Sequence, residues 1–188
     1  MEITKVKVEI ASLSDIMFDR FIDYSTERRP PEQKLYLYGK NELVLPQDNI
    51  ISFLFGIDPK GCAMAFEGKK GKDYVRMGQS HVNIDEAIIP FMSGKKPVIF
   101  KEFDDKIWKH QGSPRVKKGS ASIKSEMKER PVLRHPWSLT FHITIIKNNI
   151  IDENKLYNWF MLGGMQIAFG TYRPRFGRFT VDKWDTVS

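Results

Sequence analysis

The stretch WSLTFHITII (residues 137–146) alternates apolar and polar side chains along almost its whole length. Its odd-numbered positions from Leu139 to Ile145 are apolar, and its even-numbered positions from Ser138 to Thr144 are polar. Successive side chains of an extended chain point to opposite faces of a sheet. The alternation therefore predicts a β-strand with one buried face and one face in water.

Downstream of this strand, the sequence predicts a helix and a final strand. Asn148 and Asn149 form a turn, and Asp152 is placed to cap a helix over ENKLYNWFMLGGMQIAF (153–169). The segment GRFTVDKW (177–184) then has the residue types of a strand. The C-terminal part of the chain is therefore predicted to run strand, helix, strand.

Upstream, the segment ITKVKVEI (3–10) alternates in the same way and predicts the first strand. The next segment, SDIMFDRFIDYSTERR (14–29), is predicted to form a helix capped by Ser12 or Ser14. Acidic residues recur every fourth position on one face of this helix, which is compatible with a metal or acid/base site. The opposite face is apolar, however, and this favours an ordinary amphipathic helix. The acidic face consists of Asp15, Asp19, Asp23 and Glu27, and the apolar face of Ile16, Phe21 and Ile22.

The middle of the chain predicts short elements bounded by turn residues. A hairpin is expected over residues 34–45 with its turn at 39–41, followed by a helix that begins after Pro46 and stops at Gly56. Three short strands are then expected, together with an apolar run that is broken by Pro90. The strands are GCAMAFEG (61–68), DYVRMGQ (73–79) and PVIFKEF (97–103), and the apolar run is DEAIIPFM (85–92).

This order of elements predicts an α+β fold, with a ferredoxin-like or RRM-like antiparallel sheet, two main helices and long insertions. The length of 188 residues and an apolar content of 41% predict one domain over residues 1–188. A basic insertion loop is expected at about 104–130. Such a fold leaves the uncovered sheet face, or its loops, for a ligand.

The net charge of +7 is concentrated in one part of the chain. Nine cations and only two acids lie between Lys106 and Arg134, so this segment alone carries a net charge of +7. Its centre, residues 110–131, is rich in Gly, Ser and Pro and lacks apolar periodicity, which predicts a mobile loop. The cations considered for ligand binding here are Arg115, Lys117, Lys118, Lys124, Arg130 and Arg134.

Two further basic clusters lie elsewhere in the sequence, and each of the three clusters is next to aromatic residues. A solvated surface is one interpretation of clustered cations. The alternative is a nucleic acid, whose phosphates bind cations while its bases stack on rings. A membrane is disfavoured because the cations are expected in loops rather than on an amphipathic helix. The second cluster is Lys69, Lys70 and Lys72 beside Tyr74, and the third is Arg173, Arg175 and Arg178 beside Tyr172 and Phe176; Trp108 accompanies the first.

The third cluster lies in a glycine-rich run, GGMQIAFGTYRPRFGRF (163–179), between the last predicted helix and the last strand. Glycines such as Gly170 and Gly177 permit positive φ and allow a phosphate to approach the backbone closely. Arginine side chains offer forked N–H donors that match phosphate oxygens. A tight turn with plain surface arginines is the alternative.

This glycine-rich run resembles the C-terminal glycine-rich loop of the RAMP (repeat-associated mysterious protein) superfamily, the RNA-binding subunits and processing enzymes of CRISPR systems. The segment ELVLPQDNIISFLFG (42–56) is similar to the place in such proteins where a strand leads into the first helix. Residues 130–184 also resemble small phage-encoded proteins with a tryptophan strand, a helix and an RPxxGRF pattern. The resemblance implies a ferredoxin-like, RNA-binding fold reused by a phage or mobile element.

The residues give little indication of catalysis. No two of the four histidines are spaced to share a helical metal site, and no phosphate-loop or nucleophile-elbow motif is present. The resemblance to RNA-processing enzymes makes His110 and His135 candidate acid/base residues, with an ordinary surface or sheet histidine as the alternative. Cys62 is expected in the core. We therefore expect no cofactor and no metal.

The single cysteine excludes an internal disulfide and fits a reducing cytosol. The longest uncharged stretch, Leu156 to Tyr172, has 17 residues and is too polar to span a bilayer. The leading hypothesis is a non-enzymatic cytoplasmic protein that binds RNA or single-stranded DNA through its backbone. The alternatives are a protein-interaction module or self-assembling subunit, and a metal-independent endoribonuclease.

Overall fold

A computed structural model of the protein describes residues 2–20, 29–112 and 127–187. Its main sheet is built around the two longest predicted strands, which pair antiparallel so that Val8 faces Phe141. The third long strand pairs with the other edge of the first. These strands are β1 (Ile3–Ser12), β11 (Ser138–Ile146) and β12 (Phe179–Val187).

Three shorter strands extend this sheet along β11. The first of them pairs with Ile143–Ile145 of β11. The second pairs with β11 at Ser138, and the third pairs with the second. They are β5 (Val82–Ile84), β7 (Met92–Ser93) and β8 (Lys96–Pro97). The four strands β12-β1-β11-β5 are all antiparallel to their neighbours, and helices follow β1 and β11 in the chain. This is the βαββαβ arrangement of a ferredoxin-like α+β fold.

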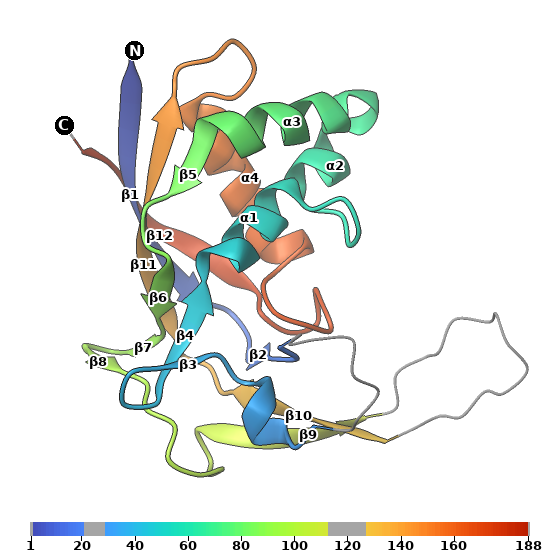
Figure 1. The fold of residues 1–188 in the computed structure, drawn as a ribbon, viewed down its shortest axis with the longest axis vertical. Coiled ribbons are helices and arrows are strands. Elements are labelled where there is room, and N and C mark those ends of the chain that lie inside the picture. The colour runs from blue at the N-terminus through green and yellow to red at the C-terminus, as the bar shows by residue number, and fades with distance from the viewer. Residues whose placement is uncertain (1, 21–28, 113–126, 188) are drawn as a thin grey trace, which may run out of the picture.

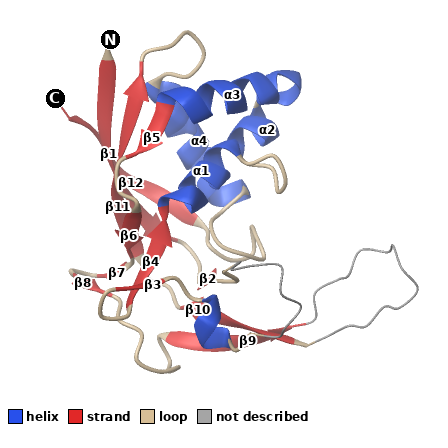
Figure 2. Ribbon diagram, in the orientation of Figure 1, coloured by secondary structure: helices blue, strands red, loops and turns tan. Residues whose placement is uncertain are grey.

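The described residues form four α-helices, which lie on one side of β1 and β11 (Figures 1 and 2). They bury the apolar side of the strands, whose outward positions are polar. The helices are α1 (Gln47–Phe55), α2 (Cys62–Phe66), α3 (Gly71–His81) and α4 (Glu153–Gln166), with short 3-10 turns at Pro31–Lys34 and Gly68–Lys70. The carboxylate of Asp152 accepts a hydrogen bond from Lys155 N at 2.8 Å, which confirms the predicted cap of α4.

Two smaller sheets lie in the lower part of the molecule in Figure 1, the first beside the lower part of the main sheet and the second below it. One contains the predicted hairpin and the apolar run that ends at Pro90, and consists of β3 (Leu37–Tyr38), β4 (Glu42–Pro46) and β6 (Ile88–Pro90). The other joins a two-residue strand to a long hairpin and consists of β2 (Ile16–Met17), β9 (Ile107–Gly112) and β10 (Lys128–Leu133).

The core is aromatic where α1 and α4 meet the sheet. Phe53 of α1 packs against Phe160 of α4, with ring centroids 5.4 Å apart, and against Phe169 and Phe179 at 4.9 and 5.5 Å. Phe169 and Phe179 stack at 4.5 Å. These two residues stand at the two ends of the glycine-rich segment, so burial of their rings fixes where that segment begins and ends.

The helix predicted over 14–29 is wrong in its described part. Ile16 and Met17 form β2, which pairs with Leu133 and Val132 of β10. Ile16, Met17 and Phe18 are consecutive and all buried, which an extended chain between two layers permits and a surface helix does not. Residues 21–28, including Asp23, Phe21, Ile22 and Glu27, lie outside the described residues.

The strands predicted at 61–68 and 73–79 are also wrong, because both segments are helical in α2 and α3. A Cβ atom at Gly78 would lie 2.1 Å from the ring of Phe55, so this glycine serves close packing of α3 on α1. The strand predicted over 97–103 is reduced to β8 and a single bridge between Ile99 and Glu42.

The prediction of a basic loop over about 104–130 is wrong at both ends of that range, because these ends pair with each other as β9 and β10. His110 faces Arg130, and Trp108 faces Val132. The centre, residues 113–126, lies outside the described residues. Within the part of the chain that the structure describes, no helix is long and apolar enough to cross a membrane.

Candidate nucleic-acid interface

The glycine-rich turn, defined here as residues 168–178, connects α4 to β12 and has a backbone that only glycine fits at two points. Gly170 and Gly177 have φ values of +76° and +79°. A Cβ atom would lie 2.4 Å from Met17 O at the first position and 1.9 Å from Phe169 O at the second. Both the dihedral angle and the packing therefore require glycine.

Backbone hydrogen bonds hold this turn against the segment around β2. Thr171 N donates to Met17 O at 2.9 Å, and Gly177 N donates to Asp15 O at 2.7 Å. The turn also closes on itself, since Phe169 N donates to Gly177 O at 3.0 Å. The path of the turn is thus set by main-chain groups, which leaves its side chains available for other contacts.

The turn carries three arginines, Arg173, Arg175 and Arg178. Arg175 and Arg178 are exposed, and Arg173 is half-buried. Burial lowers the pKa of the Arg173 guanidinium from its ordinary value, but a guanidinium keeps its charge in proteins. Within residues 2–20, 29–112 and 127–187, no carboxylate forms an ion pair with any of the three.

A cleft of about 450 Å³ lies beside the turn. Thr171, Tyr172 and Arg173 line one side, and Asp19 and Tyr36 line another. Its volume lies within the range of ligand pockets. The walls of the cleft therefore contain one arginine and three aromatic rings, those of Phe18, Tyr36 and Tyr172.

A buried ionic cluster lies behind Asp19. Arg130 Nε pairs with Asp19 Oδ2 at 2.6 Å, and the Arg130 side chain is only 7% exposed. Lys34 is also buried and donates to Glu129 O at 2.6 Å. Burial lowers the pKa of the Lys34 ammonium, and the positive charge of Arg130 adds to this shift. Two buried cations therefore lie behind the one carboxylate that lines the cleft, Asp19.

Aromatic side chains connect the β9–β10 hairpin to the turn. The ring centroid of His110 lies 5.6 Å from Phe176, 6.2 Å from Tyr172 and 5.9 Å from Trp108. The guanidinium of Arg130 lies 5.3 Å from the Tyr172 ring centroid. The structure therefore brings together four residues predicted as part of two separate basic clusters, and His110, which was a candidate acid/base residue.

The two histidines considered for catalysis have different surroundings. His110 lies in the aromatic contact described above, and its Nδ1 has no hydrogen-bond partner. His135 is exposed and its Nδ1 lies 2.8 Å from Ser12 Oγ. Among the described residues, no hydrogen bond or ring contact joins one to the other, and no cluster of acidic, histidine or cysteine side chains could hold a metal ion.

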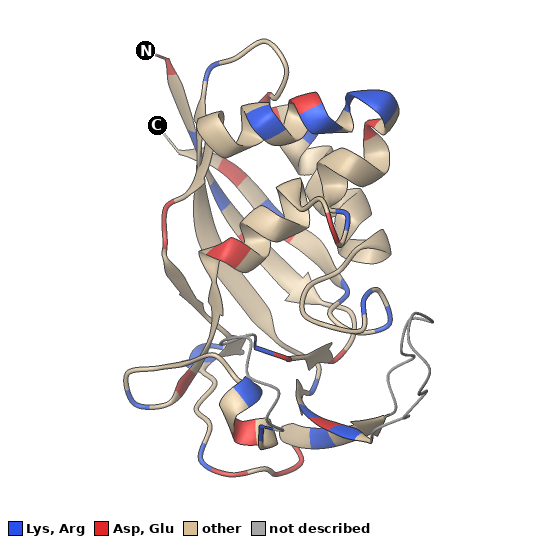
Figure 3. Ribbon diagram, turned by 45° about the vertical axis from the view of Figure 1, so that its right-hand side comes forward, with Lys and Arg blue, Asp and Glu red and all other residues tan. Residues whose placement is uncertain are grey.

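The other nominated cations are not brought to the turn, or lie outside the described residues. Lys69 and Lys70 lie in the 3-10 turn before α3 and Lys72 in its first turn, and all three are exposed. The basic turn before α3, blue in Figure 3, lies at the opposite end of the molecule from the β9–β10 hairpin (Figures 1 and 3). Arg134 is exposed directly after β10. The cations outside the described residues are Arg115, Lys117, Lys118 and Lys124.

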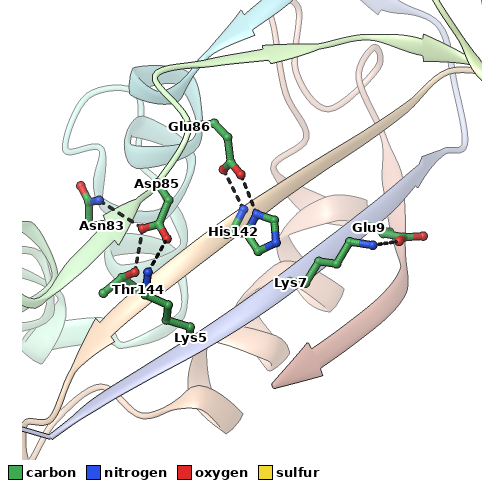
Figure 4. Close-up of polar contacts among 8 residues, drawn as sticks. All are labelled: Lys5, Lys7, Glu9, Asn83, Asp85, Glu86, His142 and Thr144. Carbon is green, nitrogen blue, oxygen red and sulfur yellow. Dashed lines mark hydrogen bonds and ion pairs between the residues drawn. The ribbon is translucent and has the colours of Figure 1, made fainter. Parts of the chain in front are cut away.

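The sheet face opposite the helices carries charges that neutralise one another (Figure 4). Lys7 pairs with Glu9 at 2.7 Å, and this contact raises the pKa of Lys7 and lowers that of Glu9. Lys5 pairs with Asp85 at 3.5 Å, and Lys183 of β12 pairs with the second oxygen of Glu9 at 3.3 Å. These cations are less available to phosphates than those of the turn.

The same face holds a histidine–carboxylate pair that the sequence analysis did not identify (Figure 4). His142 Nδ1 lies 2.6 Å from Glu86 Oε1, and the backbone N–H of His142 donates to Glu86 Oε2 at 2.8 Å. The sequence also missed the Asp19–Arg130 pair, because the two residues are 111 positions apart and no local pattern links them.

Comparisons with known proteins bear on the fold. No family model and no curated protein sequence matches the chain. Its structure is similar to a chain in the cryo-EM structure of the Type III-B Cmr-beta bound to cognate target RNA, with a TM-score of 0.55 and 13% sequence identity. The match covers 100% of this chain and 61% of that chain, so this chain spans about three-fifths of the length of its structural neighbour.

This similarity agrees with the strand order and with the helices on one face of the sheet. The chain therefore has a ferredoxin-like α+β fold.

Proposed function

We propose that this protein binds RNA, or another single-stranded nucleic acid, along the glycine-rich turn and the adjoining cleft. The observation that carries the proposal is the set of three unpaired arginines on a turn whose backbone is already fixed. Phosphates would contact Arg173, Arg175 and Arg178, and bases would stack on rings such as Tyr172 or Phe176. RNA is favoured over DNA because the similar solved structure is described as bound to target RNA.

The proposed role is binding rather than cleavage, in a phage or mobile element. The assignment to a phage or mobile element rests on the resemblance of residues 130–184 to small phage-encoded proteins. The histidines give no support to an endoribonuclease, since the described contacts of His110 are to rings and that of His135 is to a serine. Incubating labelled RNA with the protein in EDTA tests this part, and cleavage lost in His110→Ala or His135→Ala would contradict it.

The binding experiment compares two triple variants that remove the same charge from different places. One replaces Arg173, Arg175 and Arg178 by Ala, and the matched control replaces Lys69, Lys70 and Lys72 by Ala. We expect the arginine variant to bind a single-stranded oligonucleotide about 100-fold more weakly, and the lysine variant to change affinity far less. The melting temperature should change little in either variant, because neither set forms ion pairs in the described structure.

The salt dependence of binding provides a second measurement. For single strands, log K falls with log salt concentration by about 0.7 for each phosphate neutralised. Loss of three arginine contacts should therefore reduce the slope by about 2. Equal slopes for the wild type and the arginine variant would refute the proposed interface.

A second candidate function, self-assembly or docking on another protein, is favoured by the outer face of α4. Tyr157, Met161, Leu162 and Met165 are 36–49% exposed and lie on adjoining turns of the helix. Exposed large apolar groups in one patch are typical of protein interaction sites. None of these four residues belongs to the turn, so both functions are compatible in one molecule.

A further inference from the structure

Three buried nitrogen atoms of the β9–β10 hairpin have no hydrogen-bond partner: Trp108 Nε1, His110 Nδ1 and Arg130 Nη1. Buried polar atoms in proteins are nearly always bonded, and each exception needs a physical explanation. Among the described residues, these three are the unpartnered buried side-chain atoms, and all belong to the paired strands of one hairpin. Their concentration indicates a ligand site rather than scattered packing defects.

The three atoms belong to one face of the hairpin. Trp108 and His110 are two positions apart on β9 and therefore point to the same side. Arg130 of β10 is directly opposite His110 in the strand register. Tyr172 and Phe176 of the turn lie against this face, as their ring distances to His110 show.

Trp108 differs from the other tryptophans of the chain in a way that points to a missing acceptor. The indole N–H of Trp137 donates to Ser14 O at 2.9 Å. Those of Trp159 and Trp184 donate to the carboxylates of Glu67 and Glu153 at 3.0 and 3.1 Å, respectively. The fold thus provides an acceptor for every indole N–H except the one beside the turn.

Arg130 is fixed in place with one donor group unused. Its Nε is bound by Asp19, and its guanidinium lies over the Tyr172 ring. The side chain is 93% buried, since only 7% is exposed, so it cannot swing out to water without leaving Asp19. A guanidinium held in this way is preorganised for an acceptor that reaches Nη1.

We infer that this hairpin face is a subsite for a nucleobase with two adjacent acceptors, and that its ligand is guanine. This inference rests on the proposed function. Tryptophan and arginine only donate hydrogen bonds, so the ligand must offer acceptors. Guanine presents O6 and N7 side by side, whereas adenine and cytosine place an amino donor on the corresponding edge. The surrounding rings favour a flat base over a phosphate.

The base reaches this subsite from the cleft. Tyr172 lines the cleft and also covers Arg130, and it is 37% exposed. A guanine that displaces the Tyr172 ring would stack against the guanidinium of Arg130. Its acceptors would then reach the unpartnered N–H groups of Arg130 Nη1 and Trp108 Nε1.

The first test measures the affinity for oligouridine that carries one central guanine, inosine, 7-deazaguanine or adenine. Inosine keeps O6 and N7, 7-deazaguanine lacks the N7 acceptor, and adenine replaces O6 by an amino group. We expect guanine and inosine to bind about tenfold more tightly than the other two. Arg130→Lys and Trp108→Phe should abolish this preference while binding of plain oligouridine persists, because charge and ring are kept.

The second test follows the indole N–H signals by NMR, with the Trp108 signal assigned by its absence in Trp108→Phe. We expect only this signal to move downfield, with the guanine oligonucleotide and not with the adenine one. Equal affinities for all four oligonucleotides, together with an unmoved Trp108 signal, would overturn the guanine subsite alone. Absence of binding to every oligonucleotide would overturn the proposed function as well.

Discussion

At the scale of single residues, Gly177 is the position of the turn where substitution should have the largest effect. It combines a φ of +79° with a Cβ position only 1.9 Å from Phe169 O. Gly94 is a matched control, since its φ is +61° but a Cβ atom there would meet nothing within 4 Å. Comparing alanine variants of these two glycines therefore separates the free-energy cost of the positive φ from the cost of the steric clash.

We expect Gly94→Ala to lower the free energy of unfolding by about 1 kcal/mol, the usual cost of the left-handed region. Gly177→Ala should lower it by about 3 kcal/mol or more, because the backbone of Phe169 must also move. Urea denaturation measures both. Similar values for the two variants would show that the turn is not packed as described.

The glycines also show how far local sequence can be interpreted. Gly170 and Gly177 have the positive φ that their place in a glycine-rich run suggested, and that signal is local. Gly78 lies in a segment that was predicted as a strand, and the packing that requires glycine there involves the ring of Phe55, 23 residues away. Local pattern identifies that a glycine matters, but only the tertiary contact tells whether it ends an element or packs one.

At the scale of elements, the docking of the β9–β10 hairpin depends on the Asp19–Arg130 pair. Removing one member of a buried pair leaves the other charge without a partner, which usually costs about 3–5 kcal/mol. Asp19 is 30% exposed, and water will screen part of this effect. We therefore expect Asp19→Asn to lower the free energy of unfolding by about 2 kcal/mol.

A double-variant cycle distinguishes this charge effect from a simple loss of packing. In Asp19→Asn combined with Arg130→Met, no buried charge is left unpaired, so part of the lost stability should return. Strictly additive losses in the double variant would mean that the two side chains act independently.

The strands β1 and β11 and the capped helix α4 could be predicted because their signals are local. The two strands alternate strictly between apolar and polar residues, and Asp152 accepts a hydrogen bond from the backbone N–H of Lys155, three residues further on. The β9–β10 hairpin and β2 could not be predicted in this way. Ile16, Met17 and Phe18 are buried together because β10 pairs beside them, and that partner is more than a hundred residues away. The aromatic and ionic contacts of the site depend on the same pairing.

At the scale of the whole molecule, the unpaired arginines and the apolar face of α4 are separate surfaces, and this predicts separable activities. We expect wild-type protein to associate with increasing concentration, and Met161→Glu with Met165→Glu to remain monomeric, because charge on this face opposes its burial. Light scattering after size exclusion measures the mass. Oligonucleotide affinity should be unchanged in the variant, and a monomeric wild type at every concentration would exclude self-assembly.

The way the glycine-rich turn is held has a consequence for its dynamics. Thr171 and Gly177 belong to no helix or strand, yet their amides donate to Met17 O and Asp15 O. Their protons should therefore exchange with deuterium on the slow timescale of the sheet and not on that of a surface loop. A ligand that arrives at this segment would find the main chain already immobilised, and would lose little entropy beyond that of the arginine side chains it orders.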